Sequence, residues 1–250
     1  MTSKENEYRD FYNKVGAKIG WDFSRIKVVS EGGKWDFYQK VRQRCRKDDL
    51  LLDIGTGGGE RVLSLADAVH LIIGVDNSEE MIATARKNRQ ERGIRKARFF
   101  IMDSAKMDFP AGFFNLITCR HSVFKAREVY RLLAEGGIFM SQQVDETDKM
   151  NIKEFYGRGQ SYGDAGGTAC KNYIKLLQEA GFSRVFTDSY NAVEYYQTPE
   201  DLLFLLQHTP IIPDFGEEED LLLLDKFFQQ YSTPRGIKTN SSRYLIIAEK

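Results

Sequence analysis

Residues 50–60 have the sequence LLLDIGTGGGE, in which an apolar run containing one acid ends in four glycines over five positions. Val62, Leu63, Leu65 and Ala66 then follow at helical spacing. A strand, a glycine turn and a helix in this order bring backbone N–H groups close to a ligand. The alternative is a flexible surface loop, which the buried acid inside so apolar a run disfavours.

The acids around the turn indicate the kind of ligand. The dinucleotide fingerprint G-x-G-x-x-G fits Gly55 and Gly57 but meets Glu60 where its third glycine belongs, which argues against a nicotinamide oxidoreductase. A carboxylate at Asp53 repels a pyrophosphate and attracts a positive charge. S-adenosylmethionine (SAM) has an ammonium, a sulfonium and no phosphate, so the turn favours SAM.

At these residues the chain resembles the class I SAM-dependent methyltransferases, whose motif I is D/E-x-G-x-G-x-G. Asp53, Gly55, Gly57 and Gly59 match it, and residues 74–81 (GVDNSEEM) are very close to the second family motif. Further agreement lies at residues 120–121, 128–133, 136–137 and 142–144, which look like an uncharacterised type 11/25-like subgroup. Many members of that subgroup carry Arg-His-Glu where this chain has Arg120, His121 and Ser122.

Asp76 is the predicted ribose ligand. It ends an apolar strand about 20 residues after the glycine turn, where an acid accepts both ribose hydroxyls. Asp76 could instead cap the next helix, but Ser78 suits that role better, with Glu79 and Glu80 in the first turn.

The resemblance implies the remaining cofactor contacts. The methionine end would lie against the glycine turn and Asp53, and the adenine against Asp103 and the Ser104 N–H. The alternative for Asp103 is a turn residue that caps a helix. The full expected set of cofactor-binding residues is Asp53, Gly55, Thr56, Gly57, Asp76, Asn77, Met81, Asp103, Ser104 and Arg120.

His121 and Arg120 are the candidate catalytic residues. They follow the strand at 113–118, whose end faces the ligand crevice of an open parallel sheet. Neither the D/N-P-P-Y/F motif of amino-directed nucleic-acid enzymes nor the Pro-Cys pair of cytosine-C5 enzymes is present. His121 can act as a general base at neutral pH, or it can be a structural histidine bonded to a loop carbonyl.

The expected fold is α/β and Rossmann-like: a seven-stranded mixed sheet with its last strand antiparallel and helices on both faces. Residues 1–47 are expected to form a helical lid or cap, with one helix over 35–46, and residues 48–250 the SAM-binding domain. Within that domain the sequence predicts strands at 50–54, 71–76, 97–102 and 243–248 and a helix over 78–92. Two insertions, at about 145–168 and 198–240, are expected to cap the ligand face. The first is predicted to be a polar loop without periodicity. The second contains two helical patterns, over 199–207 and 217–231. Their apolar residues suit core, cap or dimer contact, and core plus cap is favoured.

Composition narrows the class of partner. The formal net charge is zero, so no global field attracts nucleic acid or an anionic membrane. Three scattered cysteines and three scattered histidines fit a reducing cytoplasm without disulfides or a metal site. We expect a cytoplasmic monomer or homodimer without a transmembrane span.

The expected activity is methyl transfer from SAM, by direct displacement, to a small-molecule acceptor. Two alternatives stay open. One is an RNA methyltransferase that uses Arg42, Arg44 and Arg46 together with the arginines of the helix over 78–92. The other is a non-catalytic SAM-binding module. Nothing in the sequence identifies the acceptor or the acceptor atom.

Overall fold

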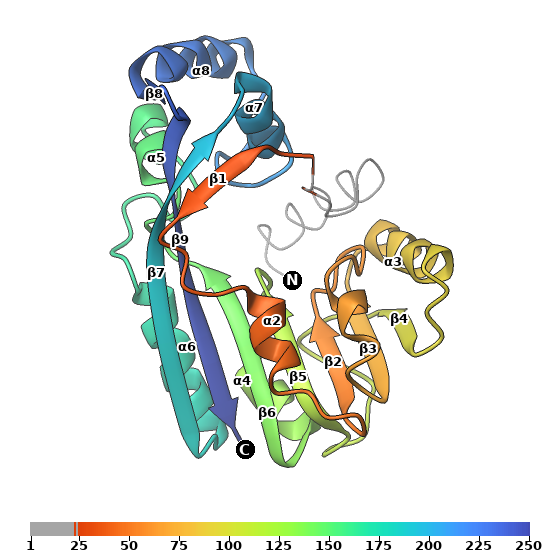
Figure 1. Cartoon of the computed structure of the whole chain (residues 1–250). Helices are drawn as coiled ribbons and strands as arrows, with labels where there is room; N and C mark the ends of the chain where they lie inside the picture. The colour runs from red at the N-terminus through yellow and green to blue at the C-terminus, as the bar shows by residue number, and fades with distance from the viewer. Residues whose placement is uncertain (1–22, 24) are drawn as a thin grey trace.

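The computed structural model describes Phe23 and residues 25–250. Within this part, strands form one mixed sheet in the order β4-β3-β2-β5-β6-β9-β7-β1, and the two-residue β8 pairs with β9 (Figure 1). The strands are β1 Val28–Glu31, β2 Leu50–Ile54, β3 Leu71–Asp76, β4 Ala97–Ile101, β5 Phe114–Arg120, β6 Leu133–Val144, β7 Arg184–Tyr196, β8 Ser232–Thr233 and β9 Gly236–Glu249. The first five of the sheet, β4 to β6, are parallel, and β9 is antiparallel to both β6 and β7.

Helices cover both faces of the sheet. The helices are α2 Phe37–Arg42, the 3₁₀ helix η1 Val62–Leu65, α3 Glu79–Glu91, α4 Ala126–Leu132, α5 Met150–Tyr156, α6 Thr168–Ala180, α7 Pro199–Gln207 and α8 Glu218–Tyr231. Alternate residues of β2 enter different cores: Leu52 and Ile54 pack with α4 and α6, whereas Leu51 packs with α2, η1 and α3. This alternation follows from the two-residue period of a strand that is buried on both faces.

A third apolar cluster lies at the end of the sheet where β6 and β7 finish. Figure 1 shows α5, α7 and α8 gathered there, around the long extensions of β7 and β9. Buried Ile152 of α5, Leu202 of α7 and Phe227 of α8 pack with Ile237 of β9. The carboxyl ends of the parallel strands therefore point toward this helical group.

The predicted fold class is confirmed, and the strand count differs. Seven strands form the expected arrangement, with the last one antiparallel, and β1 and β8 add two more. β1 pairs with β7 in the segment before Gly32, and all four of its residues are exposed, so its sequence lacks the apolar run by which a buried strand is predicted.

The structure differs most from the sequence-based expectation in residues 145–168. This segment was predicted to be a loop, but it contains α5. The helix has only seven residues and its buried side chains include Lys153, so it shows no apolar periodicity. β9 also begins seven residues before the predicted start at Arg243, because residues 236–242 are polar and pair with the outer half of β7.

Other boundaries agree more closely. Within the 198–240 insertion, α7 begins at Pro199 and α8 begins at Glu218. Thr198 and Asp201 form a capping box at the start of α7. The helix predicted over 35–46 is shorter, at Phe37–Arg42, with Asp36 as its N-cap. Residues 1–22 and 24, about half of the lid predicted over residues 1–47, lie outside the described residues.

Candidate functional site

The glycine turn joins β2 to η1 at the carboxyl edge of the sheet. Gly55, Gly57 and Gly59 have φ values of 68°, 55° and 71°, which other residues adopt at a cost. A Cβ built on Gly55 would lie 2.3 Å from the Ser122 side chain. Glycine is thus required at position 55 both for the backbone conformation and for the close approach of the loop after β5.

Asp53 is a buried carboxylate directly beneath this turn. Its side chain is almost fully buried, and the Thr118 hydroxyl on β5 donates to it at 2.6 Å. Burial raises the pKa of Asp53 to about 6, although Thr118, the Thr56 hydroxyl and the positive charge of Arg120 oppose the rise. The Thr56 hydroxyl oxygen is itself buried and has no hydrogen-bond partner that meets normal geometry among the described residues.

Asp76 connects the second motif to the turn. Its two carboxylate oxygens accept from the backbone N–H groups of Gly57 and Ser78, each at 3.0 Å. Burial raises the pKa of Asp76, while these backbone donors act in the opposite direction. Ser78 is the N-cap of α3 and accepts from the Met81 N–H, as the sequence predicts. Each Asp76 oxygen retains acceptor capacity for a hydroxyl of a ligand.

The residues expected near a ribose and adenine lie along the ends of β3 and β4. Met81 is buried in the first turn of α3, and Asn77 is exposed between Asp76 and that helix. Asp103 is exposed just beyond β4, next to the partly buried Ser104, and its carboxylate accepts from the Ala105 N–H at 2.8 Å. The turn role considered for Asp103 is therefore present, and its second oxygen remains available.

A row of polar side chains crosses the same face of the sheet beyond Asp53. Arg120 of β5 pairs with Gln142 of β6, and Gln142 pairs with Leu245 of β9. Two residues from Leu245, Arg243 pairs with Tyr190 of β7. Because paired residues share a face, and so do residues two apart on one strand, these side chains lie on the face covered by α2.

His121 is held in one tautomer by a chain of hydrogen bonds from this row. The Trp35 indole N–H, which can only donate, donates to Gln142 Oε1 at 2.8 Å. The Gln142 amide nitrogen therefore faces the ring and donates to His121 Nε2, 3.0 Å away. The proton of the neutral ring must then lie on Nδ1.

The environment of His121 also keeps the ring neutral. Burial lowers the pKa of His121 well below its ordinary value, and the nearby charges of Arg120 and Arg243 lower it further. The residue has a φ of 54° and its backbone N–H donates to Gln142 O. An Nε2 lone pair that already accepts from Gln142 is poorly placed to remove a proton, so the geometry favours the structural alternative.

The structure brings the predicted residues into two groups at one edge. The first comprises Asp53, the glycine turn and Asp76; the second comprises Arg120, His121 and the row beyond them. The sequence did not single out Gln142, Arg243 or Tyr190 as site residues, since each becomes a neighbour of Arg120 only through strand pairing. Trp35 appeared only as the start of a helix.

Among residues 25–250 and Phe23, no three His, Cys, Asp or Glu side chains are arranged to hold a metal ion. No helix in that part of the chain is long and apolar enough to cross a bilayer.

Comparison with known proteins identifies the domain that contains the glycine turn. Residues 51–137 match the family model described as a methyltransferase domain. The chain is 36% identical over 121 residues to the uncharacterized methyltransferase YcgJ of Bacillus subtilis (strain 168). The aligned region covers 46% of this chain and 47% of YcgJ. It is 37% identical over 78 residues to the aklanonic acid methyltransferase DauC of Streptomyces sp. (strain C5), covering 30% of this chain and 36% of that one. The chain thus spans less than half the length of these curated relatives.

Solved structures share the fold. The crystal structure of YcgJ has a TM-score of 0.60 at 20% identity and covers 85% of this chain and 97% of its own. The [4+2]-cyclase SpnF also has a TM-score of 0.60, at 18% identity, and covers 98% of this chain and 94% of its own. Because these identities are low, the two likenesses concern the fold alone.

Proposed function

We propose that this chain, of which residues 51–137 match a methyltransferase domain, transfers a methyl group from SAM to a small-molecule acceptor. The observation that carries the proposal is the contact between the glycine turn and Asp76. The N–H of Gly57 donates to a carboxylate that sits at the edge of the sheet where parallel strands end. A turn of left-handed glycines beside such a carboxylate fits the methionine end and the ribose of SAM better than a phosphate.

Each end of the cofactor has candidate ligands in this arrangement. Asp53 in its ionised form would attract the α-ammonium, and the backbone of Gly55, Thr56 and Gly57 would approach the amino-acid end. Asp76 would accept the ribose hydroxyls, with Asn77 beside it. Met81, Asp103 and Ser104 would lie at the adenine, and Arg120 would face the methionine end from the neighbouring strand.

When bound, SAM supplies an activated sulfonium methyl group. The residues of the chain would align the acceptor for direct displacement and exclude water. The neutral His121 would donate through Nδ1 or hold its loop in place, while Arg120 would fix the orientation of a ligand. The helices α5, α7 and α8 are proposed as a cap over the carboxyl edge of the sheet, together with the expected lid.

The contacts of the surface arginines support a small acceptor over RNA. Arg42 pairs with Asp67, and Arg46 lies within ion-pairing distance of Asp48 and Asp49. Three arginines of α3 and its C-cap donate to backbone carbonyls: Arg86 to Phe99, Arg89 to Ala97 and Arg92 to Glu60. These side chains have structural partners, so they do not form a free basic surface.

Replacement of Asp76 tests the proposal. Asp76→Ala should weaken binding of S-adenosylhomocysteine by at least tenfold, because a hydrogen bond to a charged acceptor contributes roughly 1.5–3 kcal/mol. Calorimetric titration measures this, and Asp76→Asn separates the loss of charge from the loss of shape. Asp67→Ala, a surface carboxylate paired with Arg42, is the matched control.

An unchanged affinity in Asp76→Ala would overturn the ribose assignment. Absence of S-adenosylhomocysteine binding by the wild-type protein, with native circular dichroism, would overturn the cofactor itself. If binding is confirmed, incubation with methyl-labelled SAM and pools of small metabolites should yield a labelled product.

A further inference from the structure

The row of polar side chains that crosses the sheet from Arg120 contains a second positive charge, that of Arg243, which is not among the residues expected to bind the cofactor. Arg120 is partly buried, and its guanidinium makes no hydrogen bond or ion pair with another residue of the described chain. Asp36 and Asp53 act on it only through space, and Arg61 and Arg243 repel it. Its pKa is lowered, chiefly by burial. A buried guanidinium in this situation is stabilised when an anion binds to it.

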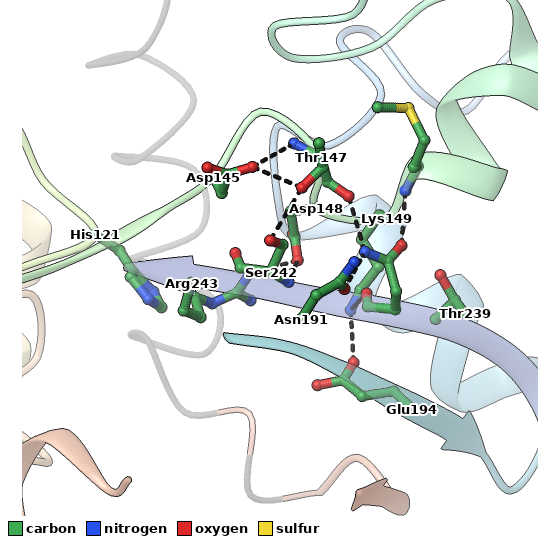
Figure 2. Close-up of polar contacts among 12 residues, drawn as sticks. His121, Asp145, Thr147, Asp148, Lys149, Asn191, Glu194, Thr239, Ser242 and Arg243 are labelled. Carbon is green, nitrogen blue, oxygen red and sulfur yellow. Dashed lines mark hydrogen bonds and ion pairs between the residues drawn. The ribbon is translucent and has the colours of Figure 1, made fainter. Parts of the chain in front are cut away.

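Arg243 provides a second guanidinium on the same face, and it is only partly used. Figure 2 shows it on β9, between His121 and the segment that contains Asp148. Its Nη1 atom donates to Asp148 and, at 2.8 Å, to the Ser242 carbonyl. Its Nε and Nη2 atoms make no hydrogen bond within the described chain. Asp148 therefore fixes the position of Arg243 and leaves one edge of its planar fork available.

The groups around the two arginines are suited to a small organic anion. Trp35 and Tyr190 lie beside the row with ring centroids 4.7 Å apart, in an edge-to-face arrangement. Tyr190 is opposite Arg243 in the strand register, and Trp35 is bonded to Gln142. Two guanidinium forks beside aromatic rings can bind a carboxylate or phosphate and contact the apolar body attached to it.

Two carboxylates beside Arg243, those of Glu194 and Asp148, are already paired with cations. Glu194 pairs with Lys149 at 2.5 Å, and Lys149 also donates to the Asn240 carbonyl (Figure 2). Asp148 pairs with Arg243. These pairs do not cancel the charge of Arg120, so the row carries an excess of positive charge.

We propose that Arg120 and Arg243 form an anion-binding subsite, and that the methyl acceptor carries a carboxylate or phosphate group held there. This inference deepens the proposed function, and its claim that the bound anion belongs to the methyl acceptor rests on that function. The subsite begins at Arg120, the last residue of β5, and Thr118 of the same strand pairs with Asp53. An acceptor anchored by its anion would therefore extend toward the cofactor site at Asp53. The anion sets specificity, and the transfer takes place at another atom of the acceptor.

A matched pair of probes tests the subsite without knowledge of the acceptor. Benzoate and neutral benzamide have the same aromatic body and differ in charge, and inorganic phosphate tests the other anion. Binding is measured by calorimetry or by protein NMR, with and without saturating S-adenosylhomocysteine. Wild-type protein should bind benzoate or phosphate at least tenfold more tightly than benzamide.

The variants are chosen to keep the fold. Arg243→Gln alone would leave buried Asp148 without its partner, so the double variant Asp148→Asn with Arg243→Gln replaces the ion pair by two neutral amides. This double variant and Arg120→Gln should each weaken anion binding at least tenfold. The double variant should retain its affinity for S-adenosylhomocysteine, whereas Arg120→Gln should weaken both. Arg184→Gln, at an exposed arginine of β7, is the control and should change neither.

Two outcomes overturn the proposal: benzamide binding as tightly as both anions, or anion binding that is unchanged in both variants with native folds. Failure of the cofactor proposal is recognised separately. In that case S-adenosylhomocysteine does not bind, while the anion titrations of the unliganded protein still report on the subsite.

Discussion

Asp53 is a residue whose pKa is changed by burial. Its carboxyl lies beneath the glycine turn, and burial raises its pKa from 3.8 to about 6. An acid whose pKa is raised on folding binds its proton more tightly in the native state than in the unfolded state. Between pH 4 and 6 the native state therefore holds more protons, and the free energy of unfolding falls as pH rises.

Asp53→Asn should remove this dependence. The amide retains an oxygen that can accept from Thr118, but it does not ionise. Asp53 costs the native state roughly 3 kcal/mol once it is fully ionised, since each pKa unit corresponds to about 1.4 kcal/mol. The difference in unfolding free energy between variant and wild type, from urea titrations at pH 4 to 7, should increase with pH in favour of the variant. A constant difference would contradict the raised pKa.

His121 gives a second prediction at this scale. The chain Trp35–Gln142–His121 requires a neutral ring with its proton on Nδ1. Nitrogen-15 NMR of the imidazole should show that tautomer, and the ring should remain neutral well below pH 6.5, because burial and the charges of Arg120 and Arg243 lower the pKa of His121. Trp35→Phe removes the donor that orients Gln142, so a mixture of tautomers is expected. Protonation of His121 near pH 6.5 in the wild type would instead restore its role as a base.

At the scale of elements, α5 is attached to the sheet by buried charge. Lys149, almost fully buried, precedes α5 and bonds Glu194 of β7 and the Asn240 carbonyl of β9. Lys149 has a φ of 51° and stands in a polar stretch of sequence without helical periodicity, so the start of the helix is not predictable from the sequence. The helix in turn brings Ile152 and Tyr156 into the cluster formed with α7 and α8.

The Lys149–Glu194 pair predicts a specific pattern of stabilities. Lys149→Met leaves the Glu194 carboxylate without its partner and should lower the free energy of unfolding by about 3–5 kcal/mol. Adding Glu194→Gln should recover part of that loss, because no uncompensated charge remains. Urea denaturation of both single variants and the double variant measures the coupling. Losses that simply add would show that the two groups are independent in the native state.

At the scale of the whole molecule, the two ends of the sheet differ in whether helices lie on their side. The amino ends of the parallel strands point away from α5, α7 and α8, and the carboxyl ends point toward the side on which these helices lie (Figure 1). β6 leads into α5 and β7 leads into α7, so chain connectivity alone places these helices on the side of the glycine turn. We propose that this group, over 145–168 and 198–240, caps the acceptor, and that the anion subsite lies beneath it.

The parallel half of the fold was predictable from local sequence. Strands β2, β3 and β4 and helix α3 appear within a residue or two of their predicted bounds, because each has an apolar run or an N-cap that acts locally. The glycine turn, Asp53 and Asp76 were found in the same way. Their positions are fixed by chemistry within about 30 residues of chain.

The second half of the site depends on pairings between distant strands. Arg243 and Tyr190 join Arg120 only because β9 inserts between β6 and β7 in one register. A shift by one residue would turn Arg243 to the opposite face. By itself, the sequence determined the fold class and the kind of cofactor that the turn favours, since both follow from local patterns. Only the tertiary structure decided which distant arginines share a face, because register is set by packing along the whole sheet.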